Sequence, residues 1–128
     1  MSGGPVQSQA ALVLSPHPDD AAFSVGGLLH RRVFAPVTIA TVFGRTNFLG
    51  VHGFQDDARE ATSIRRAEDA AFAAAIGANL ISCEFPDASV RLEPSLDAIF
   101  GDAEAIPPEL PGMLAEVVRQ VRPAVILA

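Results

Sequence analysis

ALVLSPHPDDAAFSVGG, residues 11–27, runs from an apolar segment through a histidine and two aspartates into a pair of glycines. It begins with ALVLS, a short apolar run ended by Pro16, which is typical of a strand buried on both faces. From Asp20 to Arg32 apolar residues recur at helical spacing, and Asp19 or Asp20 can cap the start of a helix. The stretch therefore predicts a strand, a tight turn that contains His17, and a helix.

The rest of the chain continues this alternation. Strands are predicted over 36–43, 79–85 and 124–128, where β-branched and other apolar residues cluster. Helices are predicted over 58–76, with Gly77 as the stop, and over 111–122. Because helices separate strands that are continuous apolar runs, we expect an α/β fold, Rossmann-like, with three α/β/α layers and a mostly parallel sheet.

Each of the two later helices is expected to bury one side. For 58–76 the expected buried side consists of Ile64, Ala67, Ala71, Ala75 and Ile76. For 111–122 it consists of Met113, Leu114, Val117, Val118 and Val121. Cys83, within the apolar run NLISCEF, is interpreted as a small buried core residue.

The composition fits one globular domain, since 128 residues that are 49% hydrophobic can bury a core without disulfides. The formal net charge of −6 and the scattered arginines argue against a nucleic-acid partner, because phosphate backbones need a concentrated basic face. No apolar run reaches the roughly 18 residues of a membrane span. The single cysteine suits a reducing compartment, so we expect a cytoplasmic protein.

Residues 1–9 are expected to form a flexible lead-in, and residues 10–128 the N-terminal portion of one domain. The last predicted strand stops at Ala128, and a buried strand is an unusual place for a terminus. We therefore expect the C-terminal part of the domain to be missing. An incomplete sheet exposes an apolar edge, so the expected partners include a second copy of the chain or a complementing C-terminal fragment.

Three polar segments follow three of the predicted strands. His17, Asp19 and Asp20 follow the first, residues 44–57 the second, and FPD (85–87) the third. In open parallel sheets ligands bind beyond the carboxyl ends of the strands, so these segments are expected to converge on one site.

His17 and Asp20 are three residues apart, and a turn of that length can aim an imidazole nitrogen and a carboxylate oxygen at one point. Zinc accepts both ligand types, and Asp19 between them could act as general base on the zinc-bound water. The alternative is that the aspartates only cap the helix and His17 is an ordinary loop residue. Spacing alone leaves both interpretations open, and His52 in the polar loop is read as solvated.

Other site motifs do not occur. The chain contains no G-x-G-x-x-G fingerprint, no phosphate loop that ends in Gly-Lys-Ser/Thr, and no G-x-S-x-G nucleophile elbow. A nucleotide-binding Rossmann-like module would fit the architecture but lacks these glycines, and a fold alone does not confer function.

The motif SPHPDDAAFSVGGLL resembles the signature of the LmbE-like (PIG-L) zinc-dependent de-N-acetylases, which runs from a strand into His-Pro-Asp-Asp-Glu and a Gly-Gly pair. Later segments resemble the family in the same order. RRAEDAAFAAAIG is similar to its Arg-x-x-Glu helix, FPD to its hydrophobic-Pro-Asp segment, and VRPAVILA to its Arg-Pro-Asp-x-Val strand. The resemblance covers most of the chain.

The resemblance implies zinc ligation by His17 and Asp20, with Asp19 as the general base, and removal of an N-acetyl or other N-acyl group from an amino sugar or related conjugate. It also implies substrate contacts for Arg65 and Asp87. A structural Arg65–Glu68 pair and a turn role for Asp87 are equally compatible with the residues.

Two departures from the family pattern stand out. Ala21 replaces the glutamate that follows Asp-Asp, and the third family ligand belongs to a histidine-containing segment beyond Ala128. His30 and His52 are not assigned to its place. The alternative to an enzyme is therefore an inactive fragment, or a binding or assembly module, with an incomplete metal site.

Overall fold

The computed structural model describes residues 8–18, 20–47, 49, 53, 57–87, 90 and 108–128. Within them lies a four-stranded sheet in the order β3-β2-β1-β4, and every strand pair is parallel. The strands are β1 (Gln9–Ser15), β2 (Phe34–Thr41), β3 (Asn79–Ser82) and β4 (Val125–Leu127). The helices are α1 (Asp20–His30), α2 (Ala58–Ile76) and α5 (Leu110–Val121). The predicted α/β fold with a parallel sheet is confirmed.

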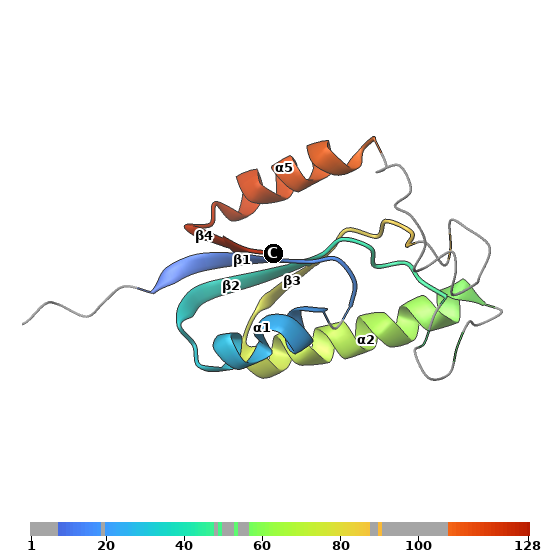
Figure 1. The fold of residues 1–128 in the computed structure, drawn as a ribbon, viewed down its shortest axis with the longest axis horizontal. Coiled ribbons are helices and arrows are strands. Elements are labelled where there is room, and N and C mark those ends of the chain that lie inside the picture. Colours follow the sequence, from blue (N-terminus) through green and yellow to red (C-terminus); the bar gives the residue numbers. More distant parts are fainter. Residues whose placement is uncertain are drawn as a thin grey trace, which may run out of the picture.

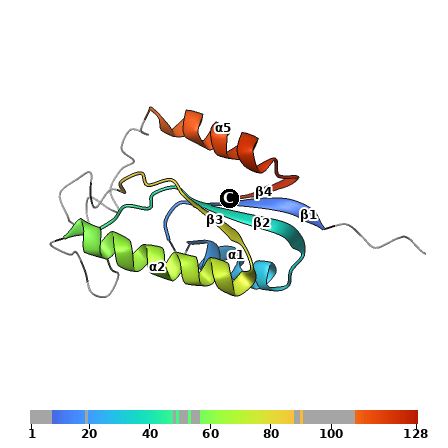
Figure 2. The ribbon, with the colours of Figure 1, turned by 180° about the vertical axis from the view of Figure 1, so that it is seen from behind.

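Helices cover both faces of the sheet. Figure 1 and the reverse view in Figure 2 show α1 and α2 side by side on one face and α5 on the other. This is the three-layer arrangement that continuous apolar strands require, because both of their faces must be shielded from water.

The alternation of side chains along the strands divides the core in two. Val13 and Ile39 pack in the cluster that includes Ala21, Leu29 and Ala73, on the side of α1 and α2. Their neighbours in sequence, Leu12 and Ala40, pack with Val117 of α5. Leu12 and Ile39 are both fully buried, so each face of the sheet has its own packed centre.

Helix α2 has the predicted bounds, and the reason for its end is visible. Gly77 adopts a left-handed conformation with φ of 69°, and its N–H donates to the carbonyl groups of Ala73 and Ala74. Glycine adopts this conformation at little cost because it has no Cβ.

The predicted buried side of α2 was largely wrong. Ile64 is 40% exposed, and Ala67, Ala71 and Ala75 are exposed as well, whereas Ile76 is partly buried. The buried residues are Ala61, Thr62, Asp69 and Ala73. Alanine lies on every side of this helix, so its pattern does not mark a face. The two buried polar residues bond to Thr41 at the end of β2 and to Thr46 in the segment that follows it. The buried side predicted for α5 is confirmed, with Val117 buried and Met113, Leu114, Val118 and Val121 partly buried.

The third strand is shorter than predicted and ends at Ser82. Cys83 therefore lies just beyond it, partly buried against the cluster on the α5 face. Burial raises the pKa of the Cys83 thiol, because it disfavours the charged thiolate.

Among the described residues, none of the helices combines the length and apolar character that a membrane span would need.

Candidate functional site

The segments that follow β1, β2 and β3 lie side by side at the carboxyl edge of the sheet. Past the strand ends, the N–H of Val42 donates to the carbonyl of Ser15 over 2.9 Å, and the N–H of Cys83 donates to that of Thr41 over 2.8 Å. The predicted convergence of the three segments is thus built by parallel pairing that continues beyond the strands.

Ser15, the last residue of β1, holds the turn into α1. Its hydroxyl donates to the carbonyl of His17 over 2.7 Å and accepts the N–H of Ala21 over 3.2 Å. One buried side chain thereby ties the middle of the turn to the first turn of the helix. Pro18, in the same turn, is buried, and its fixed φ suits the entry into a helix.

His17 and Asp20, the two predicted ligands, lie next to each other in this turn. The Oδ2 atom of Asp20 accepts the backbone N–H of His17 over 2.9 Å and lies 3.4 Å from Nδ1 of the same residue. This bond goes back to the N–H of His17, which lies before α1, so it closes the turn and does not cap an N–H of the helix. Both side chains remain about half exposed, at 51% and 47%.

The spacing of these two atoms also suits a tetrahedral metal. Two ligand atoms that are each roughly 2.1 Å from zinc at a tetrahedral angle are about 3.4 Å apart. A carboxylate has lone pairs for several partners, so the bond from the N–H of His17 does not exhaust Asp20. Within the described part of the chain, no cluster of three or more His, Cys, Asp or Glu forms a fuller metal site. Asp19 and His52 lie outside the described residues.

An aromatic row adjoins the turn. The Phe43 ring, two residues beyond β2, stacks on the His17 imidazole with centroids 5.6 Å apart and planes at 30°. Phe85, beyond β3, meets Phe43 edge-on at 6.5 Å. The stacking limits the orientations open to the imidazole, and sequence reasoning missed it because the contact depends on strand pairing.

Asp69 connects α2 to the end of β2. It is 4% exposed and accepts a 2.5 Å hydrogen bond from the Thr41 hydroxyl, which is itself buried. A buried carboxylate is costly unless hydrogen-bonded, so this contact fixes how the helix lies against the strand end. Its position four residues after Arg65 puts Asp69 one turn further along the helix that carries the predicted substrate contact.

Arg65 and Asp87 lie on different segments of the chain, α2 and the loop after β3. Arg65 is on α2, and its Nη1 donates to Oε2 of Glu68 over 2.8 Å, which confirms the predicted pair between these residues. Asp87 is 8% exposed, its N–H donates to the carbonyl of Arg45, and its own carbonyl accepts the N–H of Val90. Contact of either side chain with a substrate stays a prediction.

The segments after β2 and β3 stay joined as far as Arg45 and Pro86, which form an isolated parallel bridge. Gly44 makes this approach feasible, because a Cβ at that position would lie 2.8 Å from the Ser82 hydroxyl. The bridge holds Arg45 beside the loop that contains Glu84. Glu84 has a φ of 56°, an uncommon conformation for a residue with a side chain.

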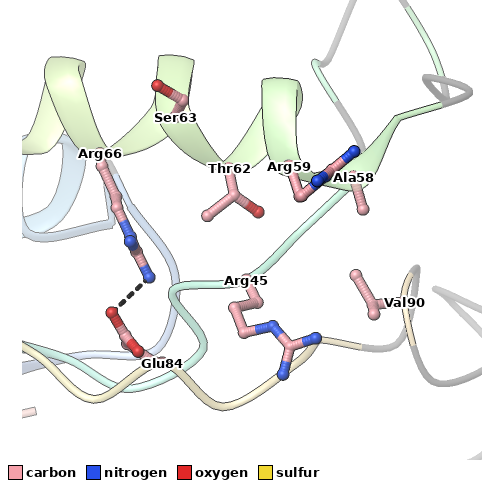
Figure 3. A pocket seen from close by; sticks show the side chains of 8 residues that line it. All are labelled: Arg45, Ala58, Arg59, Thr62, Ser63, Arg66, Glu84 and Val90. Atoms are coloured by element: carbon pink, nitrogen blue, oxygen red, sulfur yellow. Dashed lines mark hydrogen bonds and ion pairs between the residues drawn. The ribbon is translucent and has the colours of Figure 1, made fainter.

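A pocket of about 460 Å³ opens between these two segments and the start of α2. Figure 3 shows Arg66 and Thr62 of α2 on one side of it, with Arg45 and Glu84 from the two loops opposite. Arg66 Nη2 donates to Oε1 of Glu84 over 2.6 Å. The Thr62 hydroxyl donates to the carbonyl of Thr46 and accepts its N–H, both over 3.0 Å, so the helix is fastened to the loop.

The comparisons with known proteins agree with this architecture. The family model PIG-L, described as GlcNAc-PI de-N-acetylase, matches residues 12–128. No curated protein matches the sequence significantly.

Three similar solved structures illustrate the range of the fold. The N,N'-diacetylchitobiose deacetylase from Pyrococcus horikoshii is 18% identical with a TM-score of 0.69, over 94% of this chain and 40% of that one. The zinc-inhibited form of teicoplanin deacetylase Orf2 is 22% identical with a TM-score of 0.68, over 91% and 54%. GalB, a 4-carboxy-2-hydroxymuconate hydratase from Pseudomonas putida KT2440, is 18% identical with a TM-score of 0.68, over 94% and 46%.

The chain thus spans about half the length of these proteins, or less. At such identities the structures establish the fold alone, and the hydratase among them shows that this fold serves more than one reaction. The family model, in contrast, covers all but the first eleven residues, including the His17–Asp20 turn. The chain therefore belongs to the PIG-L family of GlcNAc-PI de-N-acetylases.

Proposed function

We propose that this chain carries the metal-binding part of a zinc-dependent deacetylase that hydrolyses the N-acyl amide of an amino sugar or a related conjugate. The observation that supports it best is the 3.4 Å spacing of His17 Nδ1 and Asp20 Oδ2 at the carboxyl edge of the sheet. Half-exposed side chains at that spacing suit a metal that is open to substrate on one side.

His17 and Asp20 are proposed as the zinc ligands. Zinc, when bound, supplies a Lewis acid that polarises the amide carbonyl and makes water more acidic. The Ser15 hydroxyl and the Phe43 ring support this pair, the first by holding the turn and the second by restricting the imidazole.

Asp19 is proposed as the general base. A carboxylate between the two ligands in sequence can take a proton from the attacking water and pass it to the leaving nitrogen. Water adds to the carbonyl carbon, the C–N bond breaks, and the products are a carboxylic acid and a free amine. Arg65 and Asp87 are proposed to contact the substrate from α2 and from the loop after β3.

Zinc titration by calorimetry tests the ligand pair. We expect His17→Ala to weaken zinc binding by more than about 100-fold. Loss of a residue that only supports a ligand typically lowers metal affinity by about 10–100-fold, and loss of the ligand itself should lower it further. His30→Ala is the matched control, because His30 is an exposed histidine at the other end of α1. Equal zinc affinity of the two variants would contradict the assignment of His17.

The role of Asp19 as general base is tested by measuring acetate release from N-acetylated amino sugars. The protein used must contain the complete active site. Asp19→Asn is expected to lower kcat by about 10²–10⁴-fold while zinc still binds. If Asp19→Asn keeps full activity, the role of Asp19 is wrong. If zinc binds but no acyl amide is hydrolysed, the chain is a binding module instead.

A further inference from the structure

The pocket between α2 and the two loops concentrates positive charge in an acidic protein. The chain has a formal net charge of −6 and no lysine, yet three of its nine basic residues, Arg45, Arg59 and Arg66, line this one pocket. Glu84 is the one acidic residue among the lining residues. The amide hydrolysis proposed at His17 and Asp20 does not explain why cationic side chains gather at this pocket.

The three arginines differ in how far they are already engaged. Arg66 is paired with Glu84, and Arg59, whose side chain is 94% exposed at the rim, lies 3.5 Å from Asp57. Arg45 has no ion-pair partner among the described residues, although its backbone is fixed by the bridge to Pro86. The backbone of Arg45 is fixed and its guanidinium is not engaged in an ion pair with a described residue. Such a side chain is well suited to bind an oxyanion through two parallel hydrogen bonds.

Two further features favour an anion at this place. The pocket lies at the N-terminus of the 19-residue helix α2, where the helix dipole stabilises negative charge. Ser63 is also among the residues that line the pocket and adds a polar side chain at its edge. Both add to a site that the arginines define.

The pocket is within reach of the proposed catalytic turn. Phe43 stacks on His17, and Arg45 is two residues further along the same segment, which is about 7 Å between Cα atoms in an extended chain. A conjugate whose acyl-amino group lies at His17 and Asp20 can therefore place its far end against Arg45.

We propose that Arg45, Arg66 and Arg59 form a subsite for an oxyanion, a carboxylate or a phosphate, carried by the substrate away from its acyl-amino group. For the identity of the substrate this inference rests on the proposed function, which it narrows to anionic conjugates. Arg45 makes the principal contact, and Arg66 is released from Glu84 to make the second. Arg59 closes over the anion from the rim.

Equilibrium binding of inorganic phosphate and of succinate to the 128-residue chain, without zinc and at constant ionic strength, tests the subsite. Arg45→Gln is expected to weaken binding of the preferred anion by about tenfold. Arg119→Gln is the matched control, since Arg119 is an exposed arginine paired with Glu116 on the other face of the sheet, and it should change binding by less than roughly twofold.

Glu84→Gln supplies a gain of binding that misfolding cannot mimic. Removing the carboxylate that occupies Arg66 is expected to strengthen anion binding severalfold. Unchanged or weaker binding in Glu84→Gln, or equal effects of Arg45→Gln and Arg119→Gln, would overturn the proposal. Whichever probe binds more tightly identifies the anionic group as phosphate or carboxylate.

Turnover distinguishes the subsite from the proposed function. With an active enzyme, Arg45→Gln is expected to raise KM for an anionic N-acetyl amino sugar and to leave KM for its neutral counterpart unchanged. Anion binding that depends on Arg45, without any acetate release, would support the subsite and contradict the deacetylase. If acetate is released and Arg45→Gln gives the same KM for both substrates, the deacetylase is supported and the subsite is contradicted.

Discussion

The two faces of the sheet are built differently. On the α1 and α2 face, apolar residues in the middle of the strands give way to hydroxyl groups at the carboxyl ends, Val13 to Ser15 in β1 and Ile39 to Thr41 in β2. On the α5 face the corresponding positions stay apolar or small and pack against Val117. The first face both stabilises the fold and supports the site, whereas the second is a packing surface.

The difference shows how a parallel sheet can hold polar chemistry next to a core. Ser15 and Thr41 are buried, and each bonds to a group on the helix that covers it, the N–H of Ala21 and the carboxylate of Asp69. Hydrogen bonds of this kind allow polar groups to be buried with little net cost. The turn and α2 are thereby fixed relative to the strand ends.

The largest effect is expected from the core on both faces. Ile39→Ala and Leu12→Ala should each lower the free energy of unfolding by about 2–5 kcal/mol, because both side chains are fully buried and leave a cavity. Chemical denaturation measures this, with Ile126→Ala as the control, since Ile126 is 48% exposed in β4. A loss below that of the control for either variant would mean that its face is not packed.

A smaller loss of stability is expected from removing a hydrogen bond that only the α1 and α2 face has. Thr41→Val removes the hydrogen bond to Asp69 and leaves a buried carboxylate with one partner fewer, so it should cost about 1–3 kcal/mol. Thr38→Val is the same substitution in the same strand, at a buried position on the α5 face where the hydroxyl makes no hydrogen bond to a described residue. It is expected to cost less than Thr41→Val, and equal losses would remove the distinction between the faces.

The smallest effect concerns Cys83, at the edge of the α5 face. Because burial raises the pKa of the thiol, its alkylation by iodoacetamide should require a higher pH in the folded chain than in the urea-unfolded chain. The raised pKa also means that the thiol stabilises the folded state below its unfolded pKa, and that this contribution is lost as the pH rises through the folded value. Identical pH–rate profiles would show that Cys83 is not shielded.

Features that depend on neighbouring residues in sequence were predicted well. The bounds of α2 follow from Asp57, whose carboxylate accepts the N–H of Arg59, and from Gly77 at the other end. The proximity of His17 and Asp20 follows from a three-residue turn. The buried side of α2 was not predictable in this way, because alanines lie all round the helix and Asp69 is buried by a partner 28 residues away.

The site residues that sequence reasoning missed share one property. Phe43, Arg45 and Glu84 each follow a strand in the structure. The predicted strands 36–43 and 79–85 include Phe43 and Glu84, so only the position of Arg45 after a strand could have marked it in the sequence. What could not be read was which of them meet, since the stacking on His17 and the pairing with Arg66 need the register of β1, β2 and β3.

The sequence by itself determined the order of strands and helices, the family, and the turn that brings His17 next to Asp20. These follow from local spacing, capping and apolar runs, which act over a few residues. Only the tertiary structure decided which helix covers which face, which side of α2 is buried, and that three arginines share one pocket. Those features follow from parallel strand pairing, which places segments distant in the chain side by side.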